Sequence, residues 1–208
     1  MSIRHLTVLI GLMLAAPALA QIDFTVVPGV RFGPIRVSTT RQAIPSLFGA
    51  TAVQDADIQI GEGFCTEGTR VFPGTADEIE IAWQNADRSQ VAFVRANKTG
   101  GRWRTARGVQ IGTRLTALER LAGHALTFSG FGWDYGGRLD WSEPSGKIVL
   151  VLELEPGESE KAMQWPDANA IFGDRSVRSD LPIVRRLRIR VDEISQTWGN
   201  PFGEKDCR

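Results

Sequence analysis

The sequence predicts an α+β protein made of two similar units, each a short helix followed by an antiparallel β-meander, packed as one sheet-rich domain. Three observations support this fold class. Apolar and polar residues alternate with a period of two at 78–83 and 186–191, which indicates half-buried strands. Apolar residues with helical spacing are confined to short stretches near 44–48 and 115–121. Finally, one glycine-bounded pattern occurs twice, with copies about 75 residues apart.

The repeated pattern is GVRFG at 29–33 and GVQIG at 108–112, both with the order glycine, apolar, polar, apolar, glycine. A threonine stands at the same distance before a glycine in each copy, Thr39 before Gly49 and Thr113 before Gly123. Glycine is the usual residue for a left-handed helix stop. The spacing therefore predicts duplication of a whole αβ unit rather than a solenoid repeat.

Threonine and proline define the expected helix boundaries. Thr39 with Gln42 has the spacing of a capping box, and Thr116 with Glu119 gives a second one. Thr113 is a further cap candidate in the second copy. Pro45 is incompatible with a helix interior, so the first helix is predicted to be short or kinked.

The predicted units are residues 21–104 and 105–208. Strands are expected at 57–60, 68–73, 78–83 and 90–95, and again at 126–128, 138–141, 147–154 and 186–191. The second unit also contains a long polar excursion near 155–180, with one helical turn near 158–164, and ends in a strand and a tail. Trp83, Trp103 and Trp141 are expected in the core.

The first twenty residues predict export. An apolar run at 6–14 follows Arg4 and His5, and Ala18-Leu19-Ala20 places small residues at the positions read by a signal peptidase. The alternative is a membrane anchor, but the run is shorter than the roughly 20 residues needed to span a bilayer. We therefore predict cleavage near Ala20, a periplasmic or secreted protein, and no transmembrane segment in the mature chain.

Charge and histidine content exclude several classes of function. The chain has 24 basic and 24 acidic residues, and loss of Arg4 leaves a net charge of about −1. Such a balance gives no electrostatic footprint for nucleic acid. His124 is the one histidine after cleavage, so sites that need two imidazoles are excluded, and we predict no metal and no cofactor. Glu78 and Glu80 are interpreted as solvent-facing residues that favour solubility.

The two cysteines, Cys65 and Cys207, predict a disulfide in an oxidising compartment. Such a bridge closes a loop of about 140 residues and stabilises the fold by roughly 5 kcal/mol in the chain-entropy treatment. The alternative is that both thiols are free. A Cys65–His124 nucleophile pair is the other use of Cys65, and the disulfide is the better partner.

The candidate binding residues are Phe131, Trp133, Asp134 and Tyr135, within the stretch GFGWDYGG at 130–137. Large aromatic side chains flanked by glycines make a rigid contact platform of the kind enriched at binding sites. The other interpretation is structural: Trp133 and Tyr135 close the open end of the sheet core, and Asp134 bonds a turn amide. Both interpretations stand at this point.

The paired glycine modules and GFGWDYGG resemble an uncharacterised group of exported bacterial proteins. More distantly, the architecture is similar to that of the β-lactamase-inhibitor protein and of BamE-like outer-membrane-assembly lipoproteins, which are binding modules rather than enzymes. Those modules have a helical hairpin, whereas this sequence predicts one helix per unit. The resemblance implies a binding module rather than an enzyme. Our first hypothesis is an exported, non-enzymatic binding or structural protein that acts through its sheet surface on a protein or envelope partner. The alternative is a small hydrolase or ligand-binding protein with a carboxylate and aromatic site around residues 133–135.

Overall fold

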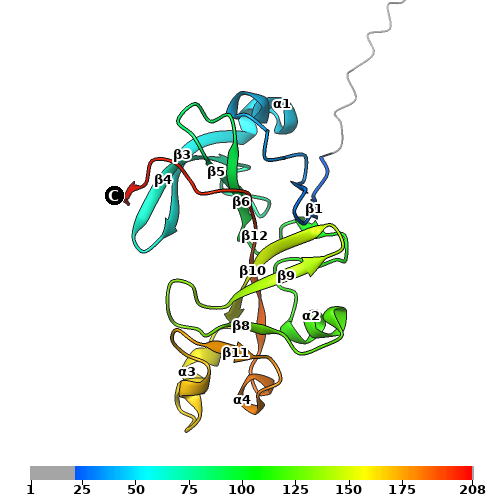
Figure 1. Cartoon of the computed structure of the whole chain (residues 1–208), viewed down its shortest axis with the longest axis vertical. Helices are drawn as coiled ribbons and strands as arrows, with labels where there is room; N and C mark the ends of the chain where they lie inside the picture. The colour runs from blue at the N-terminus through cyan, green and yellow to red at the C-terminus, as the bar shows by residue number, and fades with distance from the viewer. Residues whose placement is uncertain (1–21, 208) are drawn as a thin grey trace, which may run out of the picture.

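The structure is a computed structural model that describes residues 22–207, and the predicted signal peptide lies outside them. Its main feature is an eight-stranded sheet formed by β3 (Val53–Gly61), β4 (Phe64–Val71), β5 (Ile79–Trp83), β6 (Val91–Ala96), β9 (Arg138–Glu143), β10 (Gly146–Leu154), β12 (Ile189–Thr197) and β13 (Lys205–Asp206). The strand order is β13-β4-β5-β6-β12-β10-β9, and β3 pairs with β4 outside this path (Figure 1). All pairs in this sheet are antiparallel, which confirms the sheet-rich α+β class.

Two small sheets and a few short helices complete the fold. The small sheets are β2 (Arg31–Phe32), β1 (Thr25–Val27) and β7 (Arg104–Thr105), and β11 (Ser176–Arg178) with β8 (Thr127–Ser129). The α-helices are α1 (Ile44–Phe48), α2 (Leu115–Ala122), α3 (Glu158–Met163) and α4 (Pro182–Arg185), and the 3-10 helices are η1 (Arg41–Ala43), η2 (Ala50–Ala52) and η3 (Ala168–Ala170). In the described part of the chain, no helix is both long and apolar enough to span a bilayer.

The main sheet is continuous across the two predicted units. β12 pairs with β6 on one side and with β10 on the other, so strands from both halves share one ladder. β7, at 104–105, lies across the predicted boundary and pairs in parallel with β1. The division into 21–104 and 105–208 therefore stays a prediction, and no gap in the sheet accompanies it.

One apolar core is shared by the inner sheet face and the helices. Ile79, Ile81 and Trp83 alternate on β5 as predicted, and all three are buried. Trp103 and Trp141 are each 2% exposed, which confirms the assignment of the three tryptophans to the core. The aromatic rings pack in pairs, for example Trp103 on Phe32 with centroids 5.0 Å apart.

The first helix is short, as Pro45 predicts, because α1 starts only at Ile44 and Pro45 occupies its first turn. The predicted capping by Thr39 is wrong. The Thr39 hydroxyl accepts a hydrogen bond from Arg36 N at 2.9 Å, and Thr40 is the residue that accepts from Ala43 N. The threonine is used by the turn before the helix, so the next residue takes over the cap.

The second helix differs from expectation in the same way. The Thr113 hydroxyl accepts from Gln110 N at 3.0 Å, and α2 begins after Arg114 without a side-chain cap. The predicted capping box at Thr116 and Glu119 is wrong because Thr116 already lies inside α2. Gly123 ends the helix in the left-handed conformation with φ 78°, as predicted.

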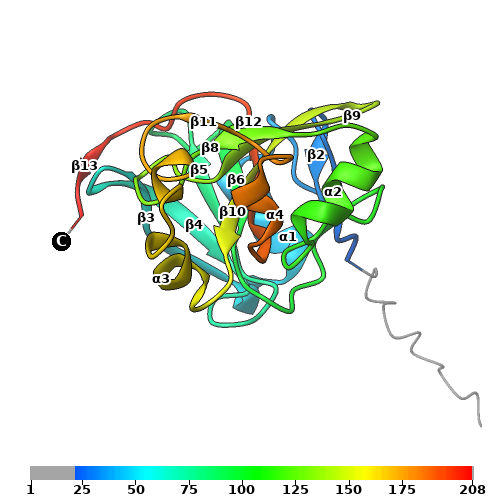
Figure 2. The same ribbon diagram turned by 90° about the horizontal axis from the view of Figure 1, so that it is seen from below.

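The polar excursion holds α3, η3, β11 and α4. Figure 2 views the molecule from the end that carries α3 and α4. The strand predicted from residue 186 begins only at Ile189, because α4 and its C-cap Arg186 occupy the start of that stretch. The disulfide is confirmed: Cys65 and Cys207 are joined at 2.03 Å, and β13 pairs with β4 beside it.

Candidate functional site

The stretch 130–137, here called the aromatic loop, connects β8 to β9 and is held firmly by backbone hydrogen bonds. Both backbone groups of Phe131 bond the segment 171–173: Phe131 N donates to Ile171 O, and Gly173 N donates to Phe131 O, each at 2.8 Å. Gly137 N donates to Ser129 O at 2.9 Å. Backbone hydrogen bonds therefore fix both ends of the loop.

The four candidate residues of the loop divide between core and surface. Phe131 is 6% exposed, with its ring centroid 5.5 Å from that of Phe128, so it closes the core. Trp133 is half-buried, its Nε1 donates to Gly130 O at 2.8 Å, and its ring lies edge-on to Tyr135 at 5.4 Å. Asp134 and Tyr135 are exposed, Tyr135 by 45%. The surface part is thus an edge-to-face aromatic pair with a carboxylate between its two members.

Tyr135 also joins the loop to the first half of the chain. Its hydroxyl donates to the Glu62 carboxylate at 3.2 Å, and this negative charge raises the pKa of the Tyr135 phenol. Glu62 forms the tip of the β3–β4 hairpin with φ 51°, between two glycines that also have positive φ, Gly61 and Gly63. The tight glycine turn sets the carboxylate where the loop can reach it.

A polar cavity of about 360 Å³ lies at the base of the aromatic loop. Arg138 and Asp140 of β9 line one side, and Asp174 and Arg175 before β11 line another. Hydroxyl and apolar groups complete its lining: Thr127, Phe128, Ser129 and Ser176. Because residues two apart on a strand point to the same face, Arg138 and Asp140 present their charges together. The cavity therefore holds two positive and two negative side chains.

The two arginines of this cavity are available to a ligand. Both are exposed. Within residues 22–207 no carboxylate oxygen lies within 4.0 Å of the Arg138 or Arg175 guanidinium nitrogens. A guanidinium presents a planar fork of donors that matches a carboxylate, so the pair suits an acidic group on a partner.

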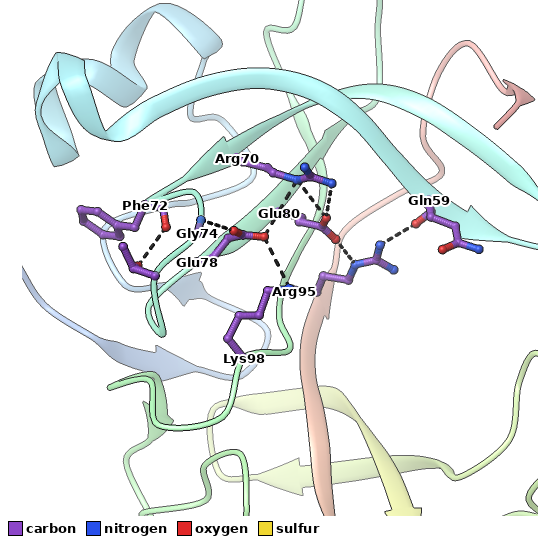
Figure 3. Close-up of polar contacts among 9 residues, drawn as sticks. Gln59, Arg70, Phe72, Gly74, Glu78, Glu80, Arg95 and Lys98 are labelled. Atoms are coloured by element: carbon purple, nitrogen blue, oxygen red, sulfur yellow. Dashed lines mark hydrogen bonds and ion pairs between the residues drawn. The ribbon is translucent and has the colours of Figure 1, made fainter. Parts of the chain in front are cut away.

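A buried ionic network crosses the same sheet on strands β4, β5 and β6 (Figure 3). Glu80 accepts from Arg95 Nε at 2.7 Å and from Arg70 Nε at 3.2 Å, and the Glu78 carboxylate accepts from Gly74 N at 2.6 Å. The solvent-facing interpretation of these two glutamates is wrong, since each is 7% exposed. β5 is buried along its whole length, and Arg70 and Arg95 from the two neighbouring strands pair with the Glu80 carboxylate.

The network and the cavity share one face of the sheet. Arg95 is opposite Ser195, Ser195 is opposite Val149, and Val149 is opposite Asp140 in the cavity wall. Cross-strand partners lie on the same face, so this row runs from the network to the cavity. Glu193 stands on β12 beside the row. Burial raises the pKa of its carboxyl, an effect that Arg95 opposes and Glu80 strengthens.

Other sequence candidates do not form a catalytic site. Cys65 is bonded to Cys207, and His124 is exposed with its Nδ1 2.8 Å from Ala125 O, so the Cys65–His124 pair does not form. Across residues 22–207, no three His, Cys, Asp or Glu side chains gather in a way that could hold a metal ion.

Comparison of the chain with protein-family models, curated proteins and solved structures finds no match. The fold and the surface alone therefore carry the functional argument. Sequence reasoning identified the aromatic loop and missed the Arg138–Arg175 cavity beside it. The cavity residues come from two segments, 127–140 and 174–176, which are more than thirty positions apart in the sequence. The pairing of β8 with β11 brings these segments together. The one local signal was the alternating, charge-bearing start of β9.

Proposed function

We propose that the protein is an exported, non-enzymatic binding protein that contacts an envelope protein through the aromatic loop and the adjoining cavity. One observation carries this proposal. A hydrogen-bonded loop presents an exposed tyrosine next to two arginines that have no carboxylate partner in the described residues. Tyrosine, tryptophan and arginine are the residues that dominate protein–protein binding energy. Export is supported by the disulfide and by the signal-like sequence at 1–20.

Preorganisation supports a binding role for the loop. Ordering a flexible loop on binding costs free energy, and a loop that is already ordered avoids much of that cost. Trp133 is fixed by its bond to Gly130, and Tyr135 is fixed by the ring of Trp133 and by Glu62.

The proposal is tested by affinity capture with a matched control. Immobilised mature protein is exposed to envelope extract, and the variant Tyr135→Ala/Arg138→Ala is compared with Val37→Ala/Arg120→Ala, which alters exposed residues elsewhere. We expect one specific protein to be retained by the native and control proteins. The loop variant should retain it at least about tenfold less strongly, the effect of losing about 1.4 kcal/mol. Repeated trials without a specific partner, or equal capture by both variants, contradict the proposal.

A second candidate is a small hydrolase or ligand-binding protein that uses carboxylates near residues 133–135. The observation in its favour is a cross-strand row in which Glu193 pairs with Val151, and Val151 pairs with Arg138 in the cavity wall. Burial raises the pKa of the Glu193 carboxyl. A carboxyl with a raised pKa is suited to donate a proton in catalysis. The test is hydrolysis of chromogenic esters and glycosides. Turnover that Glu193→Gln abolishes would favour the hydrolase, and turnover unchanged in that variant would exclude this role for Glu193.

We also propose that the two units arose by duplication. Arg36 N and Gln110 N each donate to the hydroxyl of the threonine three residues later, at 2.9 and 3.0 Å. In both turns the threonine N donates back to the carbonyl of the first residue at 3.0 Å. These matching turns support the alignment of Thr39 with Thr113. Relatives that lack one of the two glycine patterns altogether would contradict it.

A further inference from the structure

A second cavity, of about 240 Å³, lies between the turn at 85–88 and the C-terminal segment, here defined as residues 198–207. We propose that this cavity is a binding site for a small, neutral aromatic compound and that binding depends on the Cys65–Cys207 disulfide. The site is independent of the function proposed above, since it is lined by other residues.

Aromatic and small residues form half of the cavity lining, and Glu67, Asn85, Arg88 and Lys205 form the rest. Trp83 and Phe202 both line it, together with Ala86 and Gly203. Trp83 is 1% exposed, and its Nε1 already donates to the Thr69 hydroxyl at 3.2 Å. Phe202 is 54% exposed, although its backbone is fixed. Two aromatic side chains at a cavity of this size favour a flat ring as the ligand, because paired rings attract each other beyond the area that they bury.

The polar groups at the rim are already paired, which favours a neutral ligand. Arg88 contacts Glu67 at 3.0 Å and Asp55 at 3.1 Å. Lys205 contacts Asp57 at 2.8 Å. A charged ligand would have to compete with these ion pairs, whereas a neutral ring leaves them intact.

The turn that forms one wall is held in an unusual conformation. Arg88 has φ 53°, in the left-handed region that residues other than glycine rarely adopt. The turn keeps it there: Arg88 N donates to Asn85 O at 3.0 Å, and Arg41 N donates to Arg88 O at 2.9 Å. The Asn85 side chain accepts from Ser89 N at 3.0 Å. Such strain persists where the surroundings fix it, and it gathers at ligand sites.

The opposite wall is anchored by a few bonds and one covalent link. Phe202 N donates to Trp83 O at 2.8 Å, and the buried Thr66 hydroxyl donates to Phe202 O at 2.6 Å. Beyond these bonds, β13 pairs with β4 over only two residues, next to the Cys65–Cys207 bridge. The residues from Phe202 to Cys207 are exposed, so little burial holds the wall in place.

Reduction of the disulfide therefore removes the covalent anchor of the segment that carries Phe202. A dithiol reductant such as dithiothreitol supplies two electrons and two protons, which convert the Cys65–Cys207 bond to two thiols while the reductant becomes a cyclic disulfide. Coupling between two sites is reciprocal. If reduction weakens the binding of a ligand by some factor, the bound ligand must lower the equilibrium constant for reduction of the disulfide by the same factor.

The experiment uses indole as the probe and the mature, oxidised protein. Titration followed by isothermal calorimetry should give saturable binding. Phe202→Ala should weaken that binding about tenfold, since the bound ring loses one of its two aromatic neighbours. Met163→Ala, which removes a 63% exposed apolar side chain on α3, is the matched control and should bind as the native protein does. Unchanged near-UV circular dichroism establishes that each variant is folded.

The redox part has two readouts. Binding by the dithiothreitol-reduced protein should be at least about fivefold weaker, and saturating indole should slow thiol appearance in a reductant titration. Absence of indole binding by the oxidised protein, or equal binding by oxidised and reduced protein, overturns the proposal. N-acetyltryptophanamide that binds at least tenfold more tightly than indole also overturns it, because the site would then serve a protein side chain.

Discussion

Replacement of Glu80 by alanine should destabilise the fold by about 3 kcal/mol. Breaking one side of a buried ion pair costs about 3–5 kcal/mol because a charge is left without a partner. Glu80 is 7% exposed and contacts two arginines, at 2.7 Å from Arg95 and 3.2 Å from Arg70. The arginine side chains are 19% and 36% exposed, so each regains part of its hydration. This recovery places the expected loss at the lower end of the range.

Urea unfolding followed by tryptophan fluorescence measures this loss, with the midpoint and slope fitted together. Asp180→Ala is the control, because Asp180 pairs with Arg178 at 2.5 Å but its side chain is 40% exposed. That change should cost much less than Glu80→Ala does, because water screens an exposed pair. A double-mutant cycle with Arg95→Ala then isolates the Glu80–Arg95 coupling. Equal losses for Glu80→Ala and Asp180→Ala would refute the inference that burial makes this network important.

Three further predictions concern the disulfide, the Glu193 carboxyl and a glycine. Cys65→Ser/Cys207→Ser should lower the free energy of unfolding by up to about 5 kcal/mol in the chain-entropy treatment, because the bridge spans 142 positions. A loss below about 1 kcal/mol, measured by urea unfolding, would contradict this prediction. The pKa of Glu193 is raised above 4.5, so its protonated form favours the folded state, and stability falls as pH rises from that value through the folded pKa. Glutamine does not titrate, so the melting temperature of Glu193→Gln minus that of the native protein should increase as pH rises toward neutrality. A difference that stays constant with pH would contradict this prediction. Gly137→Ala should lower the free energy of unfolding by more than about 4 kcal/mol, because the added Cβ would lie 1.9 Å from Leu152 O. Gly157→Ala is the control: this glycine also has a positive φ but has open space around it, so the loss should be about 1–2 kcal/mol. Equal losses in thermal unfolding would show that strain at positive φ, rather than the clash with Leu152, determines the cost.

The strands were predictable because their signal is local. Ile79, Ile81 and Trp83 alternate with polar residues, and the structure places all three in the core. The helix caps were not predictable in the same way, since a threonine hydroxyl has several backbone donors within reach. Thr39 and Thr113 bond the turn before the helix rather than its first turn. Sequence spacing identifies the hydroxyl but does not choose its donor.

The site was predictable only in part. The composition of 130–137 identified an unusual loop, and the structure adds the partner of Tyr135, which is Glu62. That contact joins residues 73 positions apart, so no local pattern contains it. For Glu80, the secondary structure was predictable but the environment of the side chain was not. Its place on a strand was predicted correctly, but burial of its carboxylate depends on Arg70 and Arg95 from neighbouring strands.

The position of β12 sets the order in which this protein can fold. β12 lies between β6 and β10, yet it follows both in the chain and ends only at Thr197. Until it is in place, β6 and β10 each have an unpaired edge, and such edges pair readily with other chains. Pairing over such long sequence separations is slow. Nearly the whole chain must therefore be synthesised before the main sheet can close, and aggregation competes with folding until β12 inserts.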